Sequence, residues 1–459
     1  MTGSTVFDVM IVGDGFCSLS TAAHCVQESG KKARIAVIGR KERWGAGLAY
    51  GLCADYHLLN VPAGRMGAYA EKPQHFLDWA VRTIPPDEQK PFIQTSQGLE
   101  GAFVPRAWYK AYLQALADQV FNDARSKNIQ IEFFDTQADH LDYEDSLLKI
   151  RCGQQVIDAR YVVLATGVPP LVSKKDDPKA WMVSAFDRSE PFNFSTLENE
   201  TRPVVILGLG LTMIDIIMSL SHHNYRGKIY AFSRRGLLPL AHATQENPSA
   251  IDHILRKLDP LDGRLSIKMR TLRKNALLCE KSGMAWPHYI DIVRAQVPTL
   301  WSELSVREQS IFLRHALPYW NIHRHRQPQK SKSLLDEMIK RGQLTVSKQP
   351  IKWQQNGDAL EISLADGSKI NDIAHVFNAR GPDYRISRNS FLQSALDAQL
   401  IEAHPSGLGI ITDHTHSAQG KAAGALFATG SLMIGMYLDS TSVPELRAQC
   451  QTIARALVS

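Results

Sequence analysis

The sequence predicts an α/β protein with two parallel-sheet units, the second inserted into the first, and a helical insertion. A strand, a glycine-rich turn, a helix and a second strand follow one another twice along the chain. Three further short apolar strands end at glycines, and residues 248–341 are rich in Leu, Ile, Arg and Trp. The 459 residues, 44% hydrophobic and 21% charged, are enough for two or three globular domains.

The first unit opens the chain. A buried-strand pattern over 7–12 runs into Gly13-Asp14-Gly15-Phe16-Cys17-Ser18, and a helix is expected from Leu19. Gly13 permits a tight turn, and Gly15 lets the backbone approach a pyrophosphate, whose charge the helix N-terminus favours. Ser18 takes the third glycine position, where it is small enough for close packing of helix on strand, and we include it among the candidate cofactor-binding residues. The pattern is typical of a dinucleotide-binding unit, and a glycine turn without a ligand is the alternative.

The end of the second strand departs from the usual dinucleotide pattern. An acidic residue is expected there to bind a ribose hydroxyl, but the sequence has Gly39-Arg40. We include Arg40 among the candidate cofactor-binding residues. Glu42 lies nearby, and the sequence gives no reason to assign it the role of the acid.

The second unit repeats the design. A strand over 204–207 leads into Gly208 and Gly210, with a helix expected from about Met213, and the following strand ends in Ser233-Arg234-Arg235. Arginine in place of the acid is typical of a site for a 2′-phosphate, so NADPH is favoured over NADH. A solvated basic turn is the alternative interpretation.

Two such units indicate a flavin in the first and a nicotinamide coenzyme in the second, with hydride passing between them. The strands that end at Gly167, Gly381 and Gly430 would bring the chain back to the flavin domain before the nicotinamide domain and again after it. We therefore expect residues 1–170 and 375–459 to form the FAD-binding domain, with Gly167 and Gly430 at the cofactor. Residues 171–374 would form the NADPH-binding domain with its helical insertion.

Several longer motifs carry a resemblance to a known family. They read G-A-G-L-A-Y-G, L-L-N-V-P-A-G-R-M, F-V-P-R-A-W-Y, the second glycine motif with Thr212 and Asp215, S-R-R-G-L-L-P, L-P-Y-W-N-I-H-R-H-R and V-P-E-L-R, at residues 45–51, 58–66, 103–109, 208–215, 233–239, 317–326 and 443–447. The sequence resembles a bacterial family of FAD/NAD(P)-binding proteins, similar in plan to flavin N-hydroxylating monooxygenases. The resemblance extends over nearly the whole chain.

The resemblance implies roles for individual residues. Asn60 and Pro62 would lie against the isoalloxazine ring as the catalytic residues, and a structural Asn-Val-Pro turn is the alternative. Thr212 would contact the cofactor of the second unit. Arg65 and Arg106 would bind a flavin phosphate or a substrate carboxylate, although single arginines are more often surface or packing residues.

Two histidine-containing stretches raise the question of a metal. In His323-Arg324-His325-Arg326, the arginines repel a cation, so the run is interpreted as a basic helix end or as an anion-binding wall. His414 and His416 would alternate on one strand face, but they lack a third ligand. We therefore expect no metal. The tryptophans at 286, 301 and 320 are interpreted as core rather than as a substrate cage.

The resemblance implies an FAD- and NADPH-dependent monooxygenase that acts on an amine or similar small nucleophile. Alternatives are a reductase or dehydrogenase without oxygen transfer, and a non-catalytic flavin-binding redox sensor. The six cysteines form no C-x-x-C pair, which argues against a dithiol centre. A net charge of +6 gives no reason to expect nucleic acid, and no membrane segment or secretory signal is visible, so a cytoplasmic location is expected. Substrate identity and oligomeric state stay open.

Overall fold

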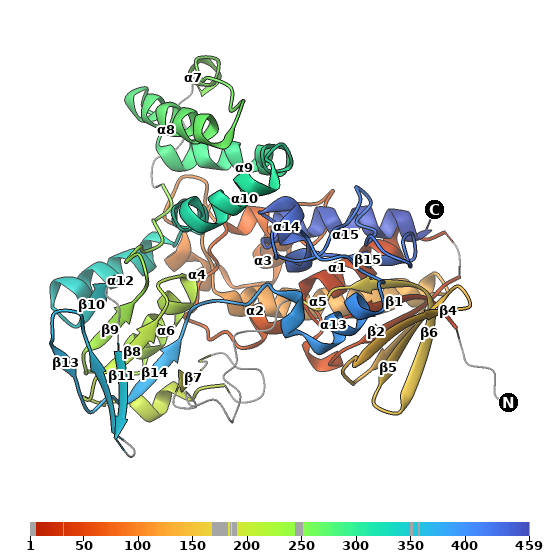
Figure 1. Cartoon of the computed structure of the whole chain (residues 1–459), viewed down its shortest axis with the longest axis horizontal. Helices are drawn as coiled ribbons and strands as arrows, with labels where there is room; N and C mark the ends of the chain where they lie inside the picture. Colours follow the sequence, from red (N-terminus) through yellow and green to blue (C-terminus); the bar gives the residue numbers. More distant parts are fainter. Residues whose placement is uncertain are drawn as a thin grey trace.

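The computed structural model describes residues 6–30, 32–167, 182–183, 185, 191–243, 251–348, 352–356 and 359–458. Within them the chain forms two sheets of mainly parallel strands, a small antiparallel sheet and a separate group of helices (Figure 1). None of the described helices is both long and apolar enough to cross a membrane.

The first sheet has the strand order β3-β2-β1-β6-β5-β4, with β15 paired to β6. Its strands are β1 (Phe7–Val12), β2 (Arg34–Ile38), β3 (Gln130–Phe134), β4 (His140–Glu144), β5 (Leu147–Cys152), β6 (Gln155–Leu164) and β15 (Leu426–Ala428). The pairs among β3, β2, β1, β6 and β15 are parallel, and β4 and β5 are antiparallel. The chain thus returns to this sheet after leaving it for more than two hundred residues.

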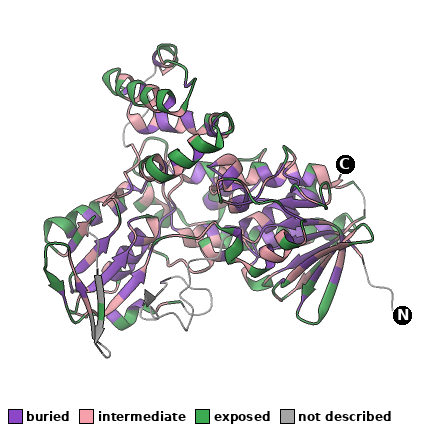
Figure 2. Ribbon diagram, viewed as in Figure 1, coloured by how far each residue is buried: buried purple, intermediate pink, exposed green. Residues whose placement is uncertain are grey.

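Apart from Asp8 near its start, the first strand is apolar, because both faces of the sheet are covered. Val9 and Ile11 pack into one hydrophobic cluster, whereas Met10 and Val12 pack into another on the opposite face. The helices of this part are α1 (Phe16–Glu28), α2 (Gly47–Gly51), α3 (His75–Thr83), α4 (Pro86–Gln89), α5 (Arg106–Ser126), α13 (Ser390–Asp397), α14 (Ile434–Tyr437) and α15 (Val443–Val458). In Figure 2 the buried strands of this sheet lie between the helices that cover its two faces.

The second sheet is entirely parallel, with the order β10-β9-β8-β14-β7. Its strands are β7 (Met182–Val183), β8 (Val204–Leu207), β9 (Ile229–Phe232), β10 (Leu344–Ser347) and β14 (His375–Asn378). One face is covered by α6 (Leu211–His222) and α12 (Gln329–Lys340). The other is covered by the antiparallel sheet of β11 (Lys352–Asn356), β12 (Ala359–Ser363) and β13 (Lys369–Ile370).

A helical group has its own core and projects above the two sheets in Figure 1. It contains α7 (Ile251–Leu255), α8 (Leu265–Lys281), α9 (Trp286–Ser302), α10 (Val306–Ile311), a π-helical turn (Phe312–Ala316) and α11 (Leu317–Arg324). The indole Nε1 of Trp301 donates to the carbonyl oxygen of Gly435 at 2.6 Å, which fastens the group to the C-terminal part. The structure confirms the predicted fold class: two Rossmann-like units, one inserted into the other, with a helical insertion.

One predicted domain boundary is wrong. We expected residue 375 to begin the second part of the FAD-binding domain, but β14 starts there and pairs with β8 in the second sheet. The strand-to-glycine pattern that ends at Gly381 therefore completes the second unit instead of returning to the first, whose closing strand is β15. The boundary predicted at 170/171 lies outside the described residues.

Candidate functional site

The first glycine of each motif makes the same close contact in its own sheet. Gly13 has φ +136°, and a Cβ there would lie 2.2 Å from the carbonyl oxygen of Ala165 at the end of β6. Gly208 has φ +112°, and its Cβ would lie 2.1 Å from the carbonyl oxygen of Ala379 after β14. No side chain fits at either position, so these two glycines are required by the fold itself.

The second glycine of each motif borders open space. Gly15 and Gly210 have φ of −90° and −81°, which any residue adopts. A Cβ on Gly15 would first meet the Cα of Gly47 at 3.9 Å, and a Cβ on Gly210 would meet nothing within 4 Å. Neither helix that begins here, α1 or α6, has a side-chain cap or an acid in its first turn. The free N–H groups and the open space fit a phosphate group.

Both helices begin earlier than we predicted. α1 starts at Phe16 instead of Leu19, and α6 starts at Leu211 instead of about Met213. The reason is that the second glycine of each motif is itself the N-cap residue. This places the helix N-terminus, with its partial positive charge, directly at the open space.

Other predicted residues gather around the first turn. Gly430 follows β15, and a Cβ there would lie 3.3 Å from Sγ of Cys17 in the first turn of α1. Gly167 follows the end of β6 with φ +63°. Arg40 is exposed just beyond β2.

Ser18 differs from its prediction as a cofactor-binding residue. The side chain is fully buried, and its hydroxyl accepts a hydrogen bond from the indole Nε1 of Trp44 at 3.0 Å. Its small size serves the packing of α1, as the third-glycine position requires. A ligand in the open space at Gly15 would not reach a group enclosed in this way.

The two arginines after β9 have different environments. Arg235 donates to the carbonyl oxygens of Arg314 and His315 at 2.8 and 3.1 Å, and its guanidinium lies 5.3 Å from the ring centre of Tyr319. These carbonyls belong to the π-helical turn. Arg234 is exposed and has no side-chain partner within the described part of the chain. Of the predicted pair, Arg234 is therefore the one available to a ligand.

The neighbouring predicted residues of the second unit have supporting positions. The hydroxyl of Ser233 accepts from the backbone N–H of Gly236 at 2.9 Å and so shapes the turn that carries Arg234. Thr212 is half-buried in the first turn of α6, next to the open space at Gly210.

Asn60 and Pro62 line a cavity of about 50 Å³ together with Arg65, His242 and residues of the helical group. Nε2 of His242 donates to the backbone carbonyl oxygen of Asn60 at 3.0 Å. Burial, and then the charge of Arg326, lower the pKa of His242 to about 3, so the imidazole is neutral at physiological pH. The loop predicted to face the flavin is thus held by a neutral donor from the second unit.

The wall of this cavity contains a buried network of arginines and acids. Arg324 pairs with Asp439, and Arg294 pairs with Asp439 at 3.2 Å and with Glu445 at 2.9 Å. Arg326 binds Asp291 at 2.5 Å; its side chain and that of Arg324 are 2% and 4% exposed. Three arginines thus face three carboxylates, and the charges balance.

The 323–326 run is a basic helix end, as expected, because α11 ends at Arg324 with His323 and Arg324 in its last turn. Its arginines are buried, as the wall alternative requires, but acids distant in the sequence already neutralise them. Burial, and then the charge of Arg324, lower the pKa of His325 well below its usual range, so it too is neutral. Arg65, by contrast, is exposed at the cavity without a side-chain partner within the described ranges. It is the arginine of this cavity that stays free for an anion.

Arg106 has a role between the two units. Its Nη1 lies 2.7 Å from Oδ2 of Asp215 on α6, and its Nε donates to the carbonyl oxygen of Leu58 at 3.0 Å. Both side chains are largely buried. We expected this guanidinium to bind a flavin phosphate or a substrate carboxylate, with a packing role as the alternative, and it contacts these protein groups instead. It fastens the loop before Asn60 to the helix of the second unit.

Sequence reasoning missed the histidine beside this ion pair. Nδ1 of His57 accepts from the backbone N–H of Ala54 at 3.1 Å, so Nε2 carries the proton. Nε2 lies 2.9 Å from Oγ of Ser219 and 3.2 Å from the carbonyl oxygen of Asp215. The partners are about 160 positions apart, and no local pattern signals such a contact.

The structure also corrects the placement of His414 and His416. They lie in a turn instead of on a strand face, and His416 has φ +67°. Burial lowers the pKa of His416 to about 4. No group of three or more candidate metal ligands occurs among the residues that the structure describes.

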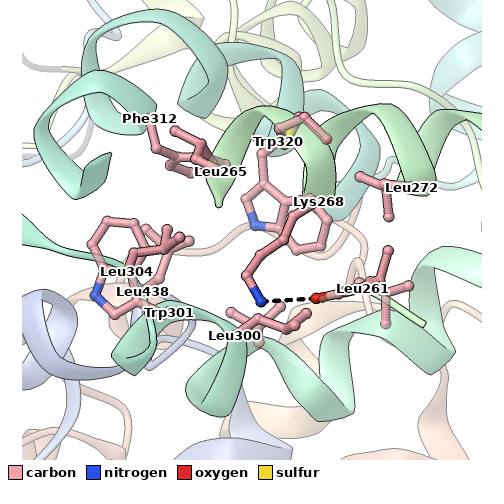
Figure 3. A pocket seen from close by; sticks show the side chains of 13 residues that line it. Leu261, Leu265, Lys268, Leu272, Leu300, Trp301, Leu304, Phe312, Trp320 and Leu438 are labelled. Carbon is pink, nitrogen blue, oxygen red and sulfur yellow. Dashed lines mark hydrogen bonds between the residues drawn. The ribbon is translucent and has the colours of Figure 1, made fainter. Parts of the chain in front are cut away.

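The helical group contains a second cavity, of about 70 Å³, shown in Figure 3. Trp301 and Trp320 contribute to its apolar wall, and the ammonium of Lys268 donates to the carbonyl oxygen of Leu261 at 2.8 Å. Lys268 also pairs with Glu303 at 2.6 Å. No predicted site residue lines this cavity, and these two tryptophans belong to the core of the helical group.

Comparisons with known proteins agree with this architecture. Residues 10–169 match the model of a family described as FAD-NAD(P)-binding. No curated protein sequence matches the chain. Among solved structures, an ornithine N-hydroxylase from Kutzneria sp. 744, with reduced FAD, NADP⁺ and L-ornithine, is 13% identical, with a TM-score of 0.63 and 99% of both chains covered.

Two further structures share the fold. A cadaverine monooxygenase from Erwinia amylovora, bound to FAD, is 12% identical with a TM-score of 0.60, covering 99% of this chain and 94% of that one. A bacillithiol disulfide reductase from Staphylococcus aureus is 13% identical with a TM-score of 0.51, covering 98% of both chains. The segment 10–169 is therefore an FAD-NAD(P)-binding domain, in a chain that has the fold of two-domain flavoprotein oxidoreductases.

Proposed function

We propose that the protein is an FAD-dependent, NADPH-using monooxygenase that acts on an amine or similar small nucleophile. The observation that carries this proposal is the pair of equivalent open spaces at Gly15 and Gly210, each at the carboxyl end of a parallel sheet and at an uncapped helix N-terminus. One space suits the pyrophosphate of FAD and the other that of NADPH. When bound, the flavin would accept hydride from the nicotinamide and then activate oxygen.

The chain's own residues would hold and orient the two coenzymes. Gly15 and the first turn of α1 would receive the FAD pyrophosphate, with Gly167 and Gly430 beside it. Gly210 and Thr212 would do the same for NADPH, and Arg234 would bind its 2′-phosphate. The ion pair of Arg106 with Asp215 would keep the two units in register.

The cavity at Asn60 suits the transfer step. Its histidines are neutral, and its three buried arginines are paired with acids, so the buried part of its wall holds groups that keep their protonation state near neutral pH. The buried wall of this cavity would limit the access of water to an oxygen-transfer step. Arg65 would bind an anionic group of the substrate at the cavity mouth. The amine class itself comes from the two related structures, whose names specify ornithine and cadaverine.

The test measures where the oxygen goes. FAD-loaded protein is supplied with NADPH, air and a panel containing L-ornithine, L-lysine and cadaverine, while oxygen uptake, peroxide and hydroxylated amine are followed. We expect one amine to give a product heavier by one oxygen atom, with less peroxide. An Asn60→Ala variant should shift the yield toward peroxide without slowing reduction by NADPH, whereas Asn122→Ala, an exposed control on α5, should not.

A reductase is the second candidate, because the bacillithiol disulfide reductase shares the fold. It would be favoured if NADPH reduced the flavin and the panel yielded only peroxide. The absence of a C-x-x-C pair argues against a neighbouring-cysteine dithiol for that chemistry. Failure of NADPH to reduce the flavin would favour the flavin-binding sensor instead.

A further inference from the structure

The carboxyl edges of the two parallel sheets carry different charges. In the second sheet, β9 is followed by Arg234 and Arg235, β10 by Lys348, and β14 by Ala379 and Arg380. No acid occurs in these short segments or in the turn 208–210. At the corresponding edge of the first sheet, Asp14, Arg40 and Asp135 follow β1, β2 and β3. The second edge is thus suited to a more highly charged anion.

The duplicated fold makes individual positions comparable. The backbone N–H of Gly39, just after β2, donates to the carbonyl oxygen of Phe134, the last residue of β3, at 3.0 Å. In the second sheet, the N–H of Ser233 donates to the carbonyl oxygen of Ser347 at 3.2 Å. The residue that follows β3 is Asp135, and the residue that follows β10 is Lys348. The two units therefore place opposite charges at equivalent positions.

Lys348 lies directly against the turn that carries Arg234. A Cβ on Gly236 would lie 3.0 Å from the Cβ of Lys348. Lys348 and Arg234 are both exposed, and neither has a side-chain partner in the described part of the chain. Arg235 is engaged with carbonyls of the π-helical turn. Two uncommitted cations thus border one turn.

We propose that Lys348, together with Arg234, binds the 2′-phosphate of NADPH and gives the second unit its preference over NADH. This proposal rests on the proposed function, which places NADPH in this unit. A phosphate monoester carries close to two negative charges, which two cations match better than one. Arg380 is excluded from this role because β14 lies two strands from β9, about 10 Å away, and its Nε donates to Asn378 at 2.9 Å.

The test uses coenzyme fragments that do not depend on flavin chemistry. The affinities of 2′,5′-ADP and 5′-AMP are measured by calorimetry for the FAD-loaded protein and for Lys348→Ala, Lys348→Asp and Lys340→Ala. Lys340 is the matched control. It is exposed at the end of α12 and precedes the amino end of β10, whereas Lys348 follows its carboxyl end. Lys348→Asp reproduces the charge of Asp135 at the equivalent position.

We expect Lys348→Ala to weaken 2′,5′-ADP binding about tenfold while 5′-AMP binding is unchanged. Lys348→Asp should abolish the preference for 2′,5′-ADP, and Lys340→Ala should have no effect. Unchanged 5′-AMP affinity also shows that the variants are folded. The proposal is overturned if the parent protein does not prefer 2′,5′-ADP, or if Lys348→Ala leaves that preference intact or weakens both fragments equally.

Failure of the proposed function gives a different result. If NADPH binds but leaves the flavin oxidised under nitrogen, the oxidoreductase proposal fails, while a preference for 2′,5′-ADP that depends on Lys348 still supports the phosphate site. If NADPH reduces the flavin but the preference for 2′,5′-ADP does not depend on Lys348, the oxidoreductase proposal stands and the phosphate site at Lys348 is refuted.

Discussion

Replacing Gly15 with alanine should separate the folding of the first unit from its binding of FAD. The added Cβ meets its nearest atom, the Cα of Gly47, at 3.9 Å, an ordinary contact, and the backbone needs no change. Alanine restricts the unfolded chain, which stabilises by about 0.4–1 kcal/mol. It is a poorer N-cap than glycine by a comparable amount. The free energy of unfolding of the apoprotein should therefore change by less than about 0.5 kcal/mol.

FAD binding should respond differently. The Cβ would occupy space over the N–H groups of the first turn of α1, where we place the pyrophosphate. A loss of about 1.4–2.8 kcal/mol of binding free energy corresponds to a Kd raised tenfold to a hundredfold. Urea denaturation of the apoprotein and quenching of FAD fluorescence measure the two quantities. A stable Gly15→Ala variant that bound FAD as tightly as the parent would refute the placement of the pyrophosphate.

Gly13→Ala is the matched contrast. Its Cβ would lie 2.2 Å from the carbonyl oxygen of Ala165, at a φ of +136° that disfavours alanine. This change should destabilise the apoprotein by several kcal/mol, because either the turn or the end of β6 must move.

Two further changes test the buried groups around the cavity. Asp439→Asn should lower the free energy of unfolding by about 3–5 kcal/mol, because Arg324 and Arg294 lose their shared buried carboxylate; a loss below 1 kcal/mol in urea denaturation would show that the network is not a buried one. His242 has a folded-state pKa of about 3, below its ordinary value near 6.5. The unfolded chain therefore takes up the proton first, and stability falls as the pH drops from about 6.5 toward 3, by up to about 1.4 kcal/mol per unit. His242→Gln should reduce this slope and the exposed control His253→Gln should not; equal slopes in all three proteins would contradict the burial of His242.

Much of the architecture was predictable because its determinants are local. The turn at Gly13 and the apolar strand before it lie within about ten residues, and the second copy at Gly208 repeats them. The atom that excludes a side chain at each first glycine belongs to a residue far along the chain, Ala165 or Ala379. The glycine itself, however, is visible in the local sequence motif. The duplicated unit therefore predicted the fold class.

The errors come from contacts between distant segments. The pattern ending at Gly381 is locally the same in either sheet, so only the pairing of β14 with β8 shows to which sheet it belongs. Arg324 has the sequence context of a basic helix end, which the structure confirms, but its burial depends on Asp439, 115 positions later. Arg106 and Arg235 likewise have partners that no local spacing indicates.

The cavity itself was predictable only in part. Asn60 and Pro62 were identified through the resemblance of their motif to a known family, and the structure places them with Arg65 at one cavity. His242, which holds the carbonyl of Asn60, follows β9 in the other unit and belongs to no recognisable motif. Lys348 likewise belongs to no recognisable motif, because its proposed role in phosphate binding depends on the pairing of β10 with β9.

Electron transfer between two bound coenzymes is the central step of the proposed function, and anaerobic titration of the FAD-loaded protein tests it directly. NADPH added under nitrogen should remove the flavin absorbance at about 450 nm, and NADH should do so only at much higher concentration. A protein that took up no FAD, or whose bound flavin stayed oxidised in excess NADPH, would contradict the account.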